Sequence, residues 1–188
     1  MQPGKASAGG LAQGMKLRTI KKQIVIFIVN HALNGTRFFA AKRRLLRSIG
    51  YEIGENTKIV GPVYNTGTLR IGADCWIGCG LTVHGNGTVT IGDRCDVAPN
   101  VTFLTGGHAI GSPDRRAGSG EVYHITVGNG VWIGGRATLL RTIRIGSGSV
   151  IAACACVLRD VPENTMAAGV PARVIKEFQD FVADAQKK

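Results

Sequence analysis

Residues 71–83 read IGADCWIGCGLTV, and this stretch contains the pattern that decides the fold. A large aliphatic residue recurs at every sixth position, at Ile71, Ile77 and Val83. The same six-residue series, broken at Asn65, continues at Ile53, Ile59, Ile91, Val97, Phe103, Val127, Ile133, Leu139, Ile145, Ile151 and Val157. Neither an α-helix, with a period of 3.6, nor a single strand, with a period of 2, keeps a strict period of six.

A period of six predicts three short strands per turn of a solenoid. Each strand points its large aliphatic residue inward, together with a small or apolar residue two positions earlier, such as Cys75 or Leu81. Eighteen residues then make one triangular coil, and successive coils stack about 4.8 Å apart through parallel strand pairing. Glycine follows the aliphatic residue at Gly54, Gly72, Gly78, Gly92, Gly128, Gly134 and Gly146. We expect these glycines to supply corner backbone angles that other residues resist, and we predict an all-β solenoid, a parallel β-helix of about five coils, over residues 52–162.

Two irregularities interrupt the series. The interval from Ile71 to Ile91 is twenty residues, which predicts a two-residue bulge around His84–Gly87. Residues 109–124, AIGSPDRRAGSGEVYH, lack the pattern altogether, and we expect an excursion loop that leaves the solenoid at a corner. Cys75 and Cys95 span the bulged coil, so they should stack in one inward column as core residues.

The positive charge of the chain is concentrated near its beginning. The 188 residues carry a net charge of +11, yet residues 1–50 hold ten Lys or Arg and no Asp or Glu. We predict that residues 1–51 form a basic amphipathic helical segment, with helices at about Met15–Leu33 and Thr36–Ile49. Their apolar faces either cap the solenoid or dock on an anionic membrane, and both can hold together. The many aliphatic residues argue against a nucleic-acid partner.

The remaining features concern location and the end of the chain. The longest apolar run, Ile24 to Val29, is far shorter than the roughly 20 residues of a membrane span. Five cysteines without an export signal favour a reducing compartment, so we expect a cytoplasmic protein. Residues 163–188 are expected to form a C-terminal extension with a short helix.

Three stretches of the chain resemble a known family. They are VAPNVTFLTGGH (97–108), ITVGNGVWIGGRATLL (125–140) and VIAACACVLRDVPENTMAAGVPARVIKEF (150–178). Together they resemble the hexapeptide-repeat acyltransferases, and in particular the maltose, galactoside and surface-polysaccharide O-acetyltransferases. The resemblance implies a left-handed β-helix, a homotrimer, and acetyl-CoA as the acyl donor, with no metal ion.

The resemblance also implies a catalytic residue. His108, in LTGGH, matches the catalytic histidine of the family. A neutral imidazole accepts the proton of an attacking hydroxyl near neutral pH, so His108 would act as the general base in direct transfer from the thioester. A backbone N–H around Gly134-Gly135 of a neighbouring subunit would stabilise the oxyanion.

Positions that match the family's coenzyme A contacts are Gly135, Ala153, Leu158, Arg159 and Arg173. Arg159 and Arg173 are the expected phosphate partners, since a guanidinium binds phosphate in a bidentate manner. Trp132 is expected to form a wall of the cofactor groove or a subunit contact.

The acceptor side departs from the family pattern. His84 and Asn86 lie where the galactoside and maltose enzymes carry paired acidic residues, so the sugar-binding carboxylate is missing. Arg115 and Arg116 either hold a charged sugar or fix the excursion loop to an adjacent subunit. We expect O-acetylation of a saccharide hydroxyl in a polysaccharide or lipid-linked precursor. The alternatives are N-acetylation of an amino sugar or xenobiotic, and a catalytically silent scaffold or membrane-associated module.

Overall fold

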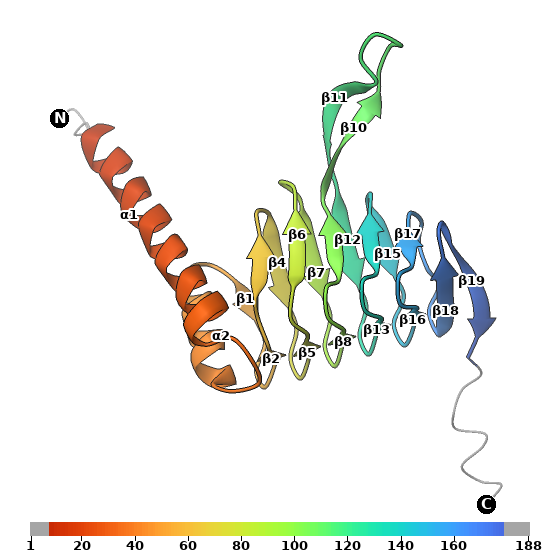
Figure 1. Cartoon of the computed structure of the whole chain (residues 1–188), viewed down its shortest axis with the longest axis horizontal. Coiled ribbons are helices and arrows are strands. Elements are labelled where there is room, and N and C mark those ends of the chain that lie inside the picture. Colours follow the sequence, from red (N-terminus) through yellow and green to blue (C-terminus); the bar gives the residue numbers. More distant parts are fainter. Residues whose placement is uncertain (1–7, 179–188) are drawn as a thin grey trace, which may run out of the picture.

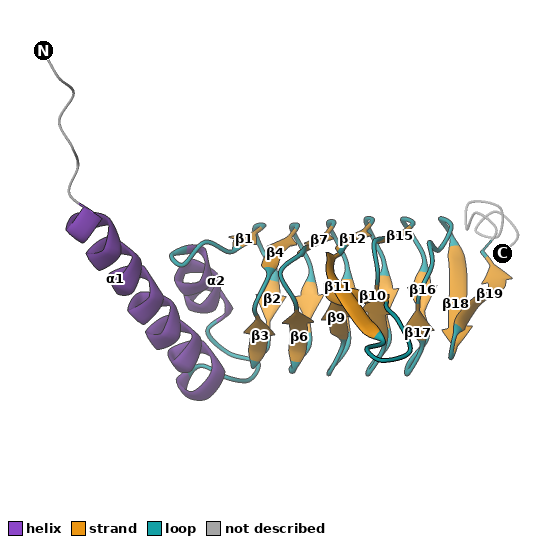
Figure 2. Ribbon diagram, turned by 90° about the horizontal axis from the view of Figure 1, so that it is seen from above, coloured by secondary structure: helices purple, strands orange, loops and turns teal. Residues whose placement is uncertain are grey.

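The protein is a long β-solenoid with two helices at one end and a projecting hairpin in its middle (Figures 1 and 2). The structure is a computed structural model that describes residues 8–178, with side chains described from Leu17 onward. The helical elements are α1 (Ala8–Phe27), the π-helical turn η1 (Ile28–Ala32) and α2 (Phe39–Arg47).

Three sheets form the faces of the solenoid. The first face consists of β1 (Glu52–Ile53), β4 (Thr68–Ile71), β7 (Thr88–Ile91), β12 (His124–Val127) and β15 (Ile143–Ile145). The second consists of β2 (Lys58–Ile59), β5 (Trp76–Ile77), β8 (Asp96–Val97), β13 (Trp132–Ile133), β16 (Val150–Ile151), β18 (Thr165–Gly169) and β19 (Ala172–Glu177). The third consists of β3 (Val63–Asn65), β6 (Leu81–His84), β9 (Thr102–Leu104), β14 (Thr138–Leu140) and β17 (Cys156–Val157).

The strand register confirms the six-residue series. Ile71 pairs with Ile53 on one side and with Ile91 on the other, so equivalent residues of successive coils lie directly above one another. The second face holds six parallel strands, which gives about six turns rather than the predicted five. The difference arises at the last turn, where Ile145 bridges Val161 after only sixteen residues and the series therefore loses its period.

The inward columns are buried, as predicted. Phe103, Ile133 and Leu139 are completely buried in one continuous core. Cys75 and Cys95 are also buried and stack on adjacent coils, with the Cys95 backbone N–H 3.4 Å from the Cys75 sulfur. Cys95 is therefore part of the core. The hydrogen bond with the Cys75 thiol and burial together raise the pKa of Cys95.

The glycines that follow the aliphatic residues serve a different purpose from the one expected. None of them adopts a left-handed φ; that conformation occurs two residues later, for example at Asp74 (φ 56°) and Arg94 (φ 54°). Instead, a Cβ at Gly78 would lie 2.8 Å from the backbone carbon of Ala98, and one at Gly128 would lie 2.7 Å from the nitrogen of Ser147. The glycines are therefore required because successive coils approach too closely there for a side chain.

The excursion after Leu104 is a hairpin rather than a loop. Strands β10 (Gly106–Ile110) and β11 (Ala117–Val122) pair antiparallel and rise from the solenoid as a two-stranded ribbon (Figure 1). The chain re-enters the first face at β12, where Val127 pairs with Ile91. Residues 109–124 lack the period of six because a projecting ribbon has no interior in which to bury an aliphatic column.

The helices cap the first coil at one end of the solenoid. Val25, Val29 and Leu46 are buried and join the solenoid core. The side-chain amide of Asn30 donates to the carbonyl of Val63 and accepts from its N–H, both at 3.0 Å. The two helices are separated, as their predicted ranges require, and the connection between them contains Gly35 at φ 98°. Within residues 8–178, neither helix is long and apolar enough to cross a bilayer.

A buried lysine fastens the connection between the two helices to the first coil. The ammonium group of Lys42 donates to the carbonyls of Gly35 (2.6 Å) and Val60 (3.1 Å), and burial lowers its pKa.

The C-terminal extension begins as a strand pair. β18 and β19 pair antiparallel and close the far end of the solenoid. The expected short helix is absent from residues 163–178, and the rest of that prediction falls on residues 179–188, outside the described part.

Candidate active site

His108 lies on β10, near the base of the hairpin, and its side chain is exposed. Its Nδ1 is 2.9 Å from the backbone carbonyl oxygen of Gly118, on the facing part of the hairpin. A carbonyl oxygen only accepts hydrogen bonds, so Nδ1 carries the proton in the neutral ring. The other nitrogen, Nε2, then holds an unshared electron pair. This arrangement gives His108 the tautomer that a general base needs.

Thr105 anchors the base of the hairpin to the solenoid, and the sequence analysis missed it. Its buried hydroxyl donates to the carbonyl of His84 at 3.0 Å and accepts from the N–H of Gly87 at 3.3 Å. The Thr105 carbonyl also accepts from the N–H of Tyr123, where the second strand returns. A polar residue directly before Gly-Gly at the end of an apolar strand is the signal that could have indicated this anchor.

Tyr123 packs against the opposite strand of the hairpin. A Cβ at Gly107 would lie 2.5 Å from the Tyr123 hydroxyl and 2.8 Å from its ring, so a larger residue beside His108 would displace the Tyr123 side chain. The Tyr123 hydroxyl donates to the Glu121 carboxylate at 2.7 Å, and this hydrogen bond raises the pKa of Tyr123. Of the two glycines of LTGGH, Gly107 is therefore the one that makes room for Tyr123 at the hairpin base.

His84 and Asn86 lie at the corner from which the hairpin leaves. This hairpin corner comprises the turns that join the third face to the first. The predicted two-residue bulge is present there, since the coil from Ile71 to Ile91 has twenty residues. His84 and Asn86 are both exposed. His84 also lines a pocket of about 460 Å³, together with Ile26, Val63, Tyr64, Asn65, Thr66 and Thr82.

Arg115 and Arg116 lie at the outer turn of the hairpin, and both are exposed. The Arg116 guanidinium donates to the carbonyl of Gly111 at 3.3 Å, across the turn. Neither guanidinium is within the pocket that contains His84.

The expected cofactor residues fall on two different corners of one chain. Gly135 and Ala153 stack at the corner that joins the second face to the third, where the Cys154 N–H donates to the Gly135 carbonyl at 2.9 Å. We call this the Gly135 corner. Leu158 and Arg159 follow β17 on the hairpin corner instead. Arg173 lies on β19, beyond both, and is exposed.

A second pocket lies beside the Gly135 corner. It has a volume of about 440 Å³ and is lined by Trp76, Asp96, Val97, Ala98, Pro99 and Trp132. Trp132 is 56% exposed, and the register places it directly beside Asp96. The carbonyl of Pro99 accepts from the N–H of Arg136, so the pocket is continuous with the turn that contains Gly135. This placement agrees with Trp132 as a wall of a groove.

Within residues 8–178, no group of three or more His, Cys, Asp and Glu side chains is arranged to hold a metal ion. His84, His108 and His124 belong to different elements, at the end of β6, on β10 and at the start of β12.

The chain matches no family model, but it has close similarity to individual enzymes. It is 33% identical over 172 residues to the galactoside O-acetyltransferase of Escherichia coli (strain K12), covering 90% of this chain and 84% of that enzyme. This chain belongs to the hexapeptide-repeat acetyltransferases. The galactoside O-acetyltransferase of Lactococcus lactis subsp. lactis (strain IL1403) is 34% identical over 140 residues, covering 72% of this chain and 67% of that enzyme.

Solved structures agree with this membership of the hexapeptide-repeat acetyltransferases. A galactoside acetyltransferase in complex with coenzyme A has a TM-score of 0.75 and 32% identity, covering 89% of this chain and 84% of that one. A hexapeptide-repeat-containing acetyltransferase from Vibrio cholerae has a TM-score of 0.76 and 28% identity, covering 93% and 96%. The fold is the left-handed parallel β-helix of the family, and the protein is an acetyltransferase.

Proposed function

We propose that this acetyltransferase transfers the acetyl group of acetyl-CoA to a saccharide hydroxyl, with His108 as the general base. The observation that carries the proposal is the 2.9 Å contact between His108 Nδ1 and the Gly118 carbonyl, which leaves Nε2 unprotonated in the neutral ring. The galactoside O-acetyltransferases to which the chain is similar support a sugar as acceptor.

The reaction proceeds by direct transfer. Nε2 of His108 takes the proton as the acceptor oxygen attacks the thioester carbonyl, and a tetrahedral intermediate forms. When this intermediate collapses, the C–S bond breaks and His108 returns the proton to the departing thiolate of CoA. The Gly134 N–H already donates to the Ile151 carbonyl, which leaves the Gly135 N–H as the proposed oxyanion donor.

Two chains together complete the proposed donor site. Gly135 and Ala153 line one corner of a chain, whereas His108, Leu158 and Arg159 belong to another corner, so a cofactor that contacts all of them must lie between neighbouring subunits. Arg159 and Arg173 would pair with the CoA phosphates. This requirement supports a homotrimer, in which each cofactor groove is shared.

The proposed acceptor site is the pocket that contains His84. Its polar lining comes from Tyr64, Asn65, Thr66, Thr82 and His84. These are hydrogen-bonding groups and an aromatic ring, which suit sugar hydroxyls and the apolar face of a pyranose. Asn86 lies on the bulge, two residues after His84, and Arg115 and Arg116 would reach the acceptor or the adjacent subunit from the hairpin turn.

The acceptor that we propose is a polysaccharide or a lipid-linked sugar precursor, modified in the cytoplasm. Peripheral contact with an anionic membrane would bring the enzyme to such a precursor. The basic segment of residues 1–51 supports this location.

The proposal is tested by following thiol release from acetyl-CoA in the presence of a panel of saccharides, with light scattering under the assay conditions. We expect saccharide-dependent thiol release, an O-acetylated product and a trimer. Transfer only to amino groups, or an active monomer, would contradict the proposed acceptor chemistry or the shared site, respectively. If no saccharide of the panel increased thiol release, so that water were the only acceptor of the acetyl group, a saccharide acceptor would be contradicted.

A further inference from the structure

Helix α1 carries an apolar stripe that the solenoid does not cover. Leu17, Ile20, Ile24 and Phe27 are spaced three or four residues apart, so they lie on one side of the helix. Their exposed fractions are 62%, 53%, 54% and 62%. The residues that pack on the solenoid are Val25, on a different side of α1, and Val29, in the η1 turn that follows. Figure 1 shows α1 extending away from the end of the solenoid.

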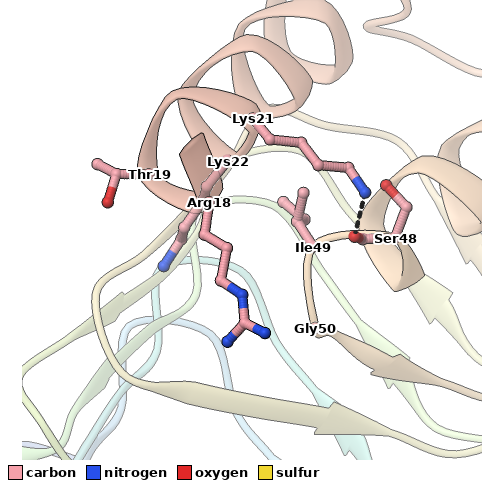
Figure 3. A pocket seen from close by; sticks show the side chains of 7 residues that line it. All are labelled: Arg18, Thr19, Lys21, Lys22, Ser48, Ile49 and Gly50. Atoms are coloured by element: carbon pink, nitrogen blue, oxygen red, sulfur yellow. Dashed lines mark hydrogen bonds between the residues drawn. The ribbon is translucent and has the colours of Figure 1, made fainter. Parts of the chain in front are cut away.

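A basic pocket lies beside the stripe. It has a volume of about 470 Å³ and is lined by Arg18, Thr19, Lys21, Lys22, Ser48, Ile49 and Gly50. Arg18, Lys21 and Lys22 come from one turn of α1, and the Lys21 ammonium donates to the Ser48 carbonyl at 2.9 Å (Figure 3). Arg18 and Lys21 directly follow Leu17 and Ile20, so they lie about 100° further round the helix. Long basic side chains in this position reach the phosphate level when their helix is buried at a membrane surface.

The charge around the pocket has no local counterpart. Residues 1–50 contain no Asp or Glu. The first two acidic residues that follow are already paired, Glu52 with Arg70 and Glu55 with Arg47, each at 2.9 Å. The exposed side chains of Arg18, Lys21 and Lys22 therefore form a patch of positive charge that is complementary to an anionic ligand.

We infer that α1 is a lipid-docking helix, whose stripe of Leu17, Ile20, Ile24 and Phe27 enters the outer acyl region of an anionic bilayer while the pocket of Arg18, Lys21 and Lys22 binds a phospholipid phosphate. An interfacial helix combines these two features, an apolar face and basic side chains. The same helical segment of a second copy fits the surface less well, because its residues 1–50 would bring ten more positive charges and no negative ones. The inference deepens the proposed location but is independent of catalysis, since its readout is binding.

The test is co-sedimentation of the full chain with phosphatidylglycerol–phosphatidylcholine vesicles and with phosphatidylcholine vesicles, at low and high salt. We expect binding to the anionic vesicles that weakens with salt, and little binding to the neutral ones. Arg18→Gln/Lys21→Gln/Lys22→Gln should weaken binding roughly 100-fold, because each basic residue at an anionic surface contributes about fivefold. Leu17→Ser/Ile20→Ser/Ile24→Ser should weaken it at low salt and at high salt alike.

Matched controls change the same residue types elsewhere. Ile110→Ser removes an apolar side chain that is 87% exposed and lies on the hairpin, outside the stripe. Arg94→Gln/Arg144→Gln/Lys176→Gln removes three exposed basic residues of the solenoid. We expect both controls to bind vesicles like the unmodified chain. Circular dichroism checks that every variant keeps its strand content.

Three results would overturn the inference. The first is equal recovery of the unmodified chain in the supernatant with and without anionic lipid. The second is a stripe variant that binds vesicles normally but changes oligomeric state in light scattering, which would make the stripe an interface between copies. The third is stabilisation of the chain, but not of the basic-pocket variant, by inorganic phosphate in the absence of vesicle binding, which would assign the pocket to a soluble phosphate.

Discussion

The solenoid and the β10–β11 hairpin are both made of strands, but they are built in opposite ways. In the solenoid every strand except β19 buries one side, and residues such as Phe103 and Ile133 are completely buried. In the hairpin the side chains are exposed or half-buried, and Ile110 is 87% exposed. The hairpin contacts the solenoid mainly through its base, at Thr105 and Tyr123.

This difference separates stability from chemistry. The stacked coils hold the hydrophobic core, and each coil is stabilised by its neighbours. The hairpin contributes little burial, yet it carries His108 and the carbonyl that orients it. Substitutions in the two regions should therefore affect different quantities, and the size of the stability effect should fall from the core, through the hairpin base, to the hairpin itself.

The largest stability effect is expected in the solenoid core. Phe103→Ala removes a completely buried ring between Val83 and Leu139 of the neighbouring coils. The free energy of unfolding should fall by about 3–5 kcal/mol, because a large cavity remains in the core. Urea unfolding followed by circular dichroism measures this change. A loss below about 1 kcal/mol would mean that the core does not hold the stack together.

An intermediate effect is expected at the junction of the two regions. Thr105→Val keeps the shape but leaves the His84 carbonyl and the Gly87 N–H without the Thr105 hydroxyl, so unfolding should become about 1–3 kcal/mol easier. Turnover should also fall, because the base of the hairpin loosens. Thr138→Val, on the outer surface of β14, is the matched control and should change little. Equal effects of both substitutions would remove the special role of Thr105.

Much of the solenoid could be predicted from the sequence, because a buried column must repeat wherever a coil repeats. Ile71, Ile77 and Val83 are spaced by the backbone path, and burial selects their residue type. The last turn was missed because its shorter path places Val161 off the period. The prediction that the glycines supply special corner backbone angles was wrong for a related reason. The close approach of Gly78 to Ala98 is a contact between two coils, and the sequence of a single strand does not indicate it.

The candidate site was less accessible to sequence reasoning. The resemblance selected His108, but its partner is a backbone carbonyl, and any residue at position 118 has one. Only the antiparallel pairing of β10 and β11, which brings Gly120 opposite His108 and Gly118 close to its ring, reveals that contact. The hairpin itself has no burial pattern to detect. Likewise, the two corners that hold the predicted cofactor residues become distinct only when the coils are assembled.

The most direct test of this division is the effect of His108→Ala on two quantities at once, the melting temperature and the turnover of acetyl-CoA with a saccharide acceptor. His108 is exposed and contacts only the hairpin through its ring nitrogen, so we predict a melting temperature within about 2 °C of the unmodified protein, since small surface changes usually stay within ±0.5 kcal/mol. Turnover should fall by roughly 10²–10⁴-fold, which is the usual contribution of a general base. Full acetyl transfer by the folded variant, or a large drop in melting temperature, would contradict the assignment of chemistry to the hairpin and stability to the solenoid.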